Sequence, residues 1–185
     1  MSLIPLGFWA ASGGGAGGAA FDLLETTTLT SSASSVTFSG LDTYSDYKHL
    51  QLRAVARDTR ATTQSSGQIT INSDTGANYA FHNLYGDGST VGSGGASSFN
   101  YIPTMTLPAA SFTANAFGIF VLDLLDFSST SKNKTLRTLA GKTGSTNTIQ
   151  LDSGLWISTS AVTAVTMAAF TGYAVGSRFS LYGVK

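Results

Sequence analysis

The stretch that decides the fold is KHLQLRAVAR, residues 48–57. Apolar side chains alternate there with polar or charged ones, at Leu50, Leu52, Ala54 and Ala56. Only Val55 departs from this alternation. Because successive side chains of a β-strand point to opposite faces, a period of two predicts a strand with one buried face and one face in water.

Similar segments follow one another from Phe21 onward, separated by clusters of Ser, Thr, Gly, Asn and Asp. Further strands are predicted at residues 35–38, 68–72, 79–85, 101–107, 117–126, 135–140, 148–151, 155–158, 162–168 and 178–184. Residues 117–126, FGIFVLDLLD, are apolar on both faces and are therefore expected at the centre of a sheet. No long stretch has the helical period. This pattern predicts an all-β, antiparallel β-sandwich of jelly-roll type, forming a single domain over residues 21–185.

The composition excludes several classes of protein. The 185 residues include no cysteine, so disulfide scaffolds and cysteine-ligated zinc are impossible. Charged residues make up 11% of the chain and sum to a net charge of zero, so nucleic-acid binding is not expected. No apolar run approaches the length of a membrane-spanning helix, and no Lys or Arg precedes the apolar N-terminus as in a secretory signal. We therefore expect synthesis in a cytoplasm and no membrane partner.

Residues 1–20 form a segment of their own, an extended N-terminal arm. An apolar peptide, residues 3–11, precedes the linker-like run SGGGAGGAA, residues 12–20. Exposing large apolar side chains to water costs about 25 cal/mol per Å². Another protein chain is therefore expected to cover Leu3, Ile4, Leu6, Phe8 and Trp9. The alternative is that the peptide docks on its own domain.

The chain offers few groups for catalysis. His49 and His82 are the only imidazoles, both lie in predicted strands, and no Gly-x-Ser-x-Gly motif accompanies them. Residues 141–143, GKT, resemble the end of a phosphate-binding loop, but the glycine needed five positions earlier is Leu136. The protein is therefore not expected to be an enzyme, and no cofactor is expected.

Acidic residues have simple structural explanations as well. Asp123 and Asp126 are expected to be solvated or paired with Arg137 or Lys132. Residues 72–78, NSDTGAN, place oxygen ligands at alternate positions, but no glutamate completes a calcium site and turn chemistry accounts for the same residues. No metal is therefore expected.

Two further features could serve in binding. Residues 86–98 lack a strand signal, which predicts a long loop, either a binding loop or a tolerated surface insertion. Four aromatic residues have faces that could stack on sugar rings of a glycan, namely Tyr79, Tyr85, Tyr101 and Trp156. The alternative is that these aromatics belong to the core or to cross-strand pairs.

Several segments resemble a family of small virion structural proteins of tailed phages that infect cyanobacteria and other aquatic bacteria. They are IPLGFWA at residues 4–10 with its following glycine run, LDTYSDYKHLQLR at 41–53, LDLLDFSSTSKNKT at 122–135 and GSRFSLYGVK at 176–185. Members of this family are described as virion, fibre or decoration proteins. The resemblance implies a component of a phage particle, made in the host bacterial cytoplasm and located in the virion, and it implies no catalytic residue.

The function expected from these observations is that of a capsid decoration or cement protein anchored by its N-terminal arm. Its partners would be the major capsid protein or tail proteins and further copies of itself, with a trimer favoured, because a small sandwich gains by burying its sheet edges. The alternative is a tail fibre or baseplate component that binds a glycan of the host surface.

Overall fold

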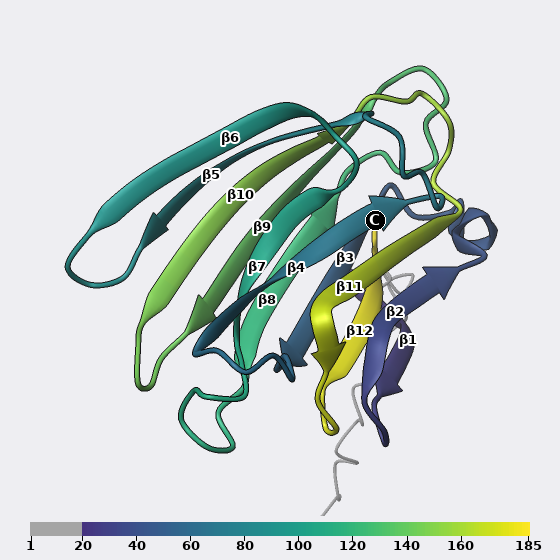
Figure 1. Cartoon of the computed structure of the whole chain (residues 1–185). Helices are drawn as coiled ribbons and strands as arrows, with labels where there is room; N and C mark the ends of the chain where they lie inside the picture. Colours follow the sequence, from purple (N-terminus) through teal and green to yellow (C-terminus); the bar gives the residue numbers. More distant parts are fainter. Residues whose placement is uncertain (1–19) are drawn as a thin grey trace, which may run out of the picture.

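The computed structural model describes residues 20–185, except the side chains of residues 104 and 105. Two antiparallel sheets pack face to face (Figure 1). The larger contains, in spatial order, β1 (Phe21–Thr28), β12 (Arg178–Val184), β3 (His49–Ala56), β8 (Gly118–Leu124), β9 (Lys134–Lys142), β10 (Thr148–Trp156), β5 (Tyr79–Gly86) and β6 (Val91–Phe99). The smaller contains β2 (Ala33–Ser39), β11 (Ala164–Tyr173), β4 (Gln64–Ile71) and β7 (Ile102–Pro108). The prediction of an all-β antiparallel sandwich is therefore confirmed.

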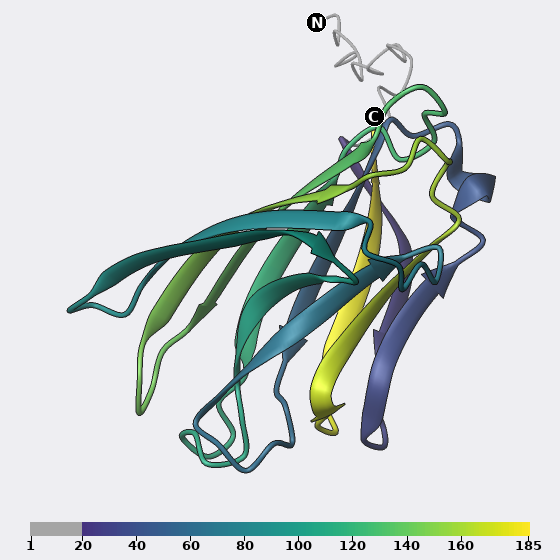
Figure 2. The ribbon, with the colours of Figure 1, turned by 45° about the horizontal axis from the view of Figure 1, so that its top comes forward.

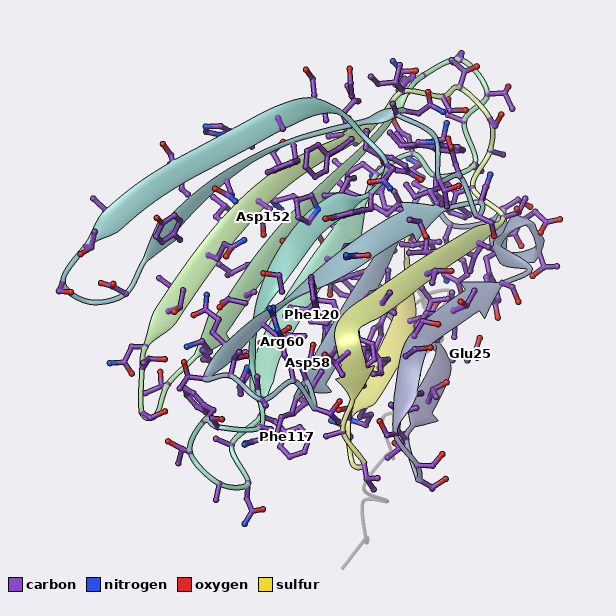
Figure 3. The ribbon with its side chains drawn as sticks, viewed as in Figure 1. Glu25, Asp58, Arg60, Phe117, Phe120 and Asp152 are labelled. Carbon is purple, nitrogen blue, oxygen red and sulfur yellow. The ribbon has the colours of Figure 1, made fainter. Side chains whose placement is uncertain are left out.

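Period-two alternation places the core between the sheets. The four apolar residues that alternate along β3 are all buried, as the sequence predicts. Leu52 lies opposite Leu122 of β8, and Ala54 lies opposite Phe120. From the smaller sheet Phe38, Ile69 and Val165 join the same cluster. Figure 3 shows Phe120 behind β4, between the two sheets.

Strand β8 lies in the middle of the larger sheet, between β3 and β9, as its apolar sequence predicts. Its two faces differ, however. Phe120, Leu122 and Leu124 are buried against the smaller sheet, whereas the side chain of Ile119 is 60% exposed on the opposite face. The apolar character of both faces therefore reflects a core on one side and an uncovered apolar surface on the other.

The prediction of a long loop at residues 86–98 was wrong. These residues form the turn and most of the second strand, β6, of the β5–β6 hairpin. Strand β6 pairs with β5 along most of its length, although its sequence VGSGGASSF has little strand propensity. The turn is closed by Asp87, whose carboxylate accepts hydrogen bonds from the backbone N–H groups of Ser89 and Thr90. Gly88 adopts the positive φ of 96° that such a tight turn requires. Pairing with β5 thus overrides the local sequence.

Two other boundaries differ from the sequence prediction. Residues 148–151 and 155–156 belong to one strand, β10, because the intervening Asp152, Ser153 and Gly154 continue the pairing with β9 and β5, and this strand ends before residues 157 and 158. Residues 21–28 form β1, which sequence periodicity missed because a bulge between Leu23 and Glu25 interrupts the alternation.

The larger sheet extends beyond the smaller one. Strand β7, the edge of the smaller sheet, packs over β9 and β10. The β5–β6 hairpin projects past that edge and curves outward (Figures 1 and 2). Its inner face is therefore only partly covered. The one helical element of residues 20–185 is the short 3-10 turn η1 (Leu41–Tyr44), and no helix there is long and apolar enough to cross a membrane.

Candidate functional site

The structure presents two candidate binding surfaces, one on each side of the overhanging part of the larger sheet. The first is the face turned away from the core, here called the outer apolar face. It consists of aliphatic side chains that are 43–87% exposed, namely Ile119, Leu139, Leu151, Ile149, Leu84 and Val91. These side chains come from five adjacent strands, β8, β9, β10, β5 and β6.

Strand register makes the outer apolar face continuous. One row of directly opposed residues runs through Val121, Leu139, Leu151 and Leu84. The next row runs through Ile119, Gly141, Ile149, Gly86 and Val91. Adjacent strands lie about 4.8 Å apart, so opposed side chains of the first row are close enough to contact one another, whereas Gly141 and Gly86 separate the side chains of the second row. Between the rows the surface forms a shallow apolar groove of about 420 Å³. Contiguous exposed apolar surface of this kind marks interaction sites on proteins.

A polar row borders the outer apolar face. Arg137 donates to Asp123 at 2.9 Å, and Gln51 donates to the same carboxylate at 2.7 Å. The pKa of Asp123 lies below its usual value, because these hydrogen bonds and the guanidinium charge outweigh its partial burial. The pairing of Asp123 with Arg137 is one of the alternatives that the sequence left open. It gives the apolar surface a polar rim, as protein interfaces have.

The second surface is a concave cleft between the edge of the smaller sheet and the inner side of the β5–β6 overhang. Its volume is about 180 Å³. Its lining residues are neutral: Gln64 and Ser66 of β4, Asn83 and Tyr85 of β5, Pro103 of β7, and Thr148 and Gln150 of β10. We refer to it below as the concave cleft.

Glycines of β6 leave room for two β5 side chains that line the concave cleft. Tyr85 lies opposite Gly92 and Asn83 lies opposite Gly94. A Cβ atom at Gly92 would come within 2.4 Å of the Tyr85 Cζ and hydroxyl oxygen atoms. The tyrosine ring therefore lies across β6 in space that any other residue at position 92 would fill. Its side chain nevertheless remains 43% exposed.

A buried polar cluster supports the cleft from behind. Asp152 of β10 is fully buried and accepts hydrogen bonds from Thr138 Oγ1 at 2.5 Å and Gln150 Nε2 at 2.6 Å (Figure 3 labels Asp152). Burial raises the pKa of Asp152, and the two hydrogen bonds offset part of this effect. The bond to Gln150 fixes its amide at the cleft. Among the atoms that the structure describes, the buried Oδ1 of Asn83 has no hydrogen-bond partner.

Two of the four predicted glycan contacts are wrong. Tyr79 is fully buried, and its hydroxyl donates to the Asp74 carbonyl oxygen at 2.9 Å and accepts from the Ile71 N–H. Trp156 is 3% exposed, and its indole N–H donates to the Asp74 carboxylate at 2.7 Å. Both rings belong to the core, because the covered ends of β5 and β10 point them between the sheets. Neither offers a face to a sugar.

The other two predicted glycan contacts lie on one side of the molecule but in separate depressions. Tyr85 lines the concave cleft, and Tyr101 lines a neighbouring depression of about 200 Å³ with Arg60 and Phe170. The two depressions share Ser66 and Pro103. Tyr101 also packs edge to face against Phe99, with ring centroids 5.5 Å apart.

His49 and the acidic turns have structural partners. Strands β8, β9 and β10 separate His49 on β3 from His82 on β5, so the structure does not bring the two imidazoles together. His49 Nδ1 accepts a hydrogen bond from the Asp126 backbone N–H at 3.0 Å. The carboxylate of Asp126 accepts one from Lys132 at 2.7 Å, as the pairing alternative expects.

The segment 72–78 is a turn that holds core residues. The carboxylate of Asp74 accepts hydrogen bonds from the Gly76 N–H at 2.8 Å, from Asn78 and from Trp156. These bonds lower the pKa of Asp74, that from Trp156 most. The turn chemistry offered in place of a calcium site thus accounts for these residues.

Sequence reasoning missed three amides of the concave cleft, Gln64, Asn83 and Gln150. Asn83 has a signal in the sequence, because it lies two residues from both Phe81 and Tyr85 and therefore shares one face of a predicted strand with them. Gln64 has none, because its position depends on where β4 crosses the larger sheet. The predicted arm residues Leu3, Ile4, Leu6, Phe8 and Trp9 lie outside the described residues.

Comparisons with known proteins give no relative from which a role could be carried over. No protein-family model, no curated protein and no solved structure matches this chain.

Proposed function

We propose that this protein is a structural component of a phage particle, most simply a decoration or cement protein of the capsid. The observation that carries the proposal is the outer apolar face, where six aliphatic side chains are exposed in cross-strand register. Burying them against a neighbouring particle subunit would remove the unfavourable exposure of apolar surface to water. The virion-like segments of the sequence support the same assignment.

The proposed mechanism is binding without chemistry. The outer apolar face contacts a capsid protein, and the N-terminal arm, through Leu3, Ile4, Leu6, Phe8 and Trp9, anchors the subunit to its neighbours. Self-association, with a trimer favoured, would multiply modest contacts through multivalency. Many weak contacts at adjacent sites then hold capsid subunits together.

The finer fold assignment is also part of this proposal. Strands β1, β12, β3 and β8 face β2, β11, β4 and β7, and the chain passes from one sheet to the other in the order expected of a jelly roll. On this assignment β5–β6 and β9–β10 are hairpin insertions that widen one sheet. The insertions supply most of the outer apolar face and most of the concave cleft.

The test is incorporation into particles of the phage that encodes the chain. Phage with Leu139→Ser and Ile149→Ser combined should contain at least about tenfold less of this protein per purified virion, since both changes lie in the exposed face and lower its apolar area. Val175→Ser, at an equally exposed valine between β11 and β12, is the matched control and should incorporate normally. Normal incorporation of the double variant would overturn the role of this face.

A second candidate location is the tail, as a fibre or baseplate component. The concave cleft favours it, because Tyr85 and three amides form a small polar depression suited to a surface ligand. Gold-labelled antibody against residues 21–185 distinguishes the locations on intact virions. Gold over the head supports decoration, gold at the tail tip supports the second candidate, and absence of the protein from virions would overturn both.

A further inference from the structure

We propose that the concave cleft binds a neutral carbohydrate, with the ring of Tyr85 stacked on one sugar and the amides of Asn83, Gln150 and Gln64 bonded to its hydroxyl groups. This proposal does not depend on a place in a virus particle. It rests on the shape, the polarity and the rigidity of the cleft.

Tyr85 supplies the stacking surface. A pyranose has an apolar face of C–H groups and a rim of hydroxyl groups, so it packs on an aromatic ring whose surroundings are polar. The Tyr85 ring is held across Gly92, lies near the backbone of β6 and is still 43% exposed. A ring restrained in this way loses little conformational entropy when a ligand packs on it.

The amides supply the hydrogen bonds. An amide carries both donors and an acceptor, which suits hydroxyl groups that also do both. Gln150 is held in place through its bond to Asp152. Asn83 Oδ1 is buried beside Gly94 without a partner among the described atoms, so a rotation of this amide toward a ligand hydroxyl in the cleft would satisfy a costly orphan acceptor. Ser66 and Thr148 add hydroxyl groups at the rim.

The charges favour a neutral sugar. None of the side chains found to line the cleft is charged, and the carboxyl of Asp152 lies behind it, bonded to the amide of Gln150. The pKa of Asp152 is raised by burial, so an acidic sugar at the cleft would raise it further and would gain no cation. Arg60, in the neighbouring depression, lies over the ring of Phe170 at 4.2 Å and belongs to that second space.

The depression that holds Tyr101 adjoins the cleft. Because the two depressions share Ser66 and Pro103, an oligosaccharide with one unit on Tyr85 can extend to Tyr101. The volume of about 180 Å³ at Tyr85 suits a single ring, and the neighbouring depression adds about 200 Å³. Longer neutral oligosaccharides should therefore bind more tightly than single sugars.

The experiment uses the full chain on an array of neutral and acidic oligosaccharides, followed by titration of each retained oligosaccharide. Saturable binding of a neutral oligosaccharide is expected, and Tyr85→Ala should weaken it by about tenfold. Phe21→Ala is the matched control, since it removes an aromatic ring that is also 43% exposed but lies on β1, at the opposite edge of the larger sheet. It should leave binding unchanged.

A second variant changes the ring position without removing the ring. Gly92→Ala displaces the Tyr85 ring through a contact with the far end of a side chain, so the fold should survive while binding falls. Retention of acidic oligosaccharides alone, or of none, would overturn the proposal. So would a Tyr85→Ala variant that binds as the wild type does, or an equal loss in Phe21→Ala. A neutral peptide that binds the cleft where no glycan does would assign it to a protein partner instead.

Discussion

The two halves of the larger sheet show the same alternation of side chains, but their inner faces have different surroundings. In the covered half, the inner residues of β3 and β8 face the smaller sheet and are all buried. In the overhang, the inner face carries Asn83, Tyr85 and the glycines of β6, and it remains partly open. A period of two thus identifies which side chains share a face, but the extent of the opposite sheet decides whether that face becomes core or cleft.

The transition occurs within a single strand. Inner positions of β5 begin at Tyr79, which is fully buried, and end at Tyr85, which is 43% exposed. Between them Phe81 packs partly buried against the core, and Asn83 lies beside the buried Asp152. Exposure of the inner positions therefore rises along β5 as the strand passes the edge of the smaller sheet at β7.

The largest effect should come from removing core volume in the covered half. Phe120→Ala leaves a cavity where the ring meets Phe179, with centroids 6.4 Å apart, and should lower the free energy of unfolding by about 3–5 kcal/mol. Tyr85→Ala, in the overhang, should lower it by less than about 1 kcal/mol. Urea denaturation of both variants measures the difference. Equal losses would show that the overhang is as closely packed as the core.

A smaller effect is expected at the junction where β5 and β10 enter the covered half. Asp74→Ala leaves the buried indole N–H of Trp156 without its acceptor, which should cost about 1–3 kcal/mol. Asp87→Ala is the matched control, because that carboxylate also closes a turn by accepting backbone N–H bonds but lies at the exposed tip of the overhang. Thermal denaturation should show a clear drop in Tm for the first variant and a smaller one for the second.

The sequence predicts most of the covered half. Strand periodicity at residues 48–57 and 117–126 identifies β3 with its buried face and β8 with its central place in the sheet, because their inner residues have apolar partners to pack against. It fails for β6, whose three glycines give it weak strand propensity, so that the segment becomes a strand only by pairing with β5. Long-range pairing, unlike alternation, leaves no local signal.

The candidate site is less predictable for the same reason. Tyr85 was identified by residue type, together with Tyr79 and Trp156, which the structure places in the core. Residue type alone does not distinguish the covered end of β5 from its open end. The outer apolar face was also missed, since Leu139, Ile149 and Leu151 come together only when β9, β10 and β5 pair in register.

The smallest expected effect is a difference in pH dependence between a buried carboxyl and an exposed one. Burial raises the pKa of Asp152, so between its unfolded value of 3.8 and its folded value the native chain binds more protons than the unfolded chain. Stability from this group therefore falls as pH rises through that window. As the pH rises from 2.5 to 7, the free energy of unfolding of Asp152→Asn should therefore increase relative to that of the wild type, as measured by urea denaturation.

The contribution of Asp126 to stability depends on pH in the opposite direction. Its hydrogen bond with Lys132 lowers its pKa below 3.8, so its contribution to stability is present above that value and is lost as the pH falls through the folded value. As the pH rises over the same range, the free energy of unfolding of Asp126→Asn should decrease relative to that of the wild type. If both variants shifted in the same direction, Asp152 would be ionised as readily as a surface carboxyl, and the polar cluster behind the concave cleft would be open to water.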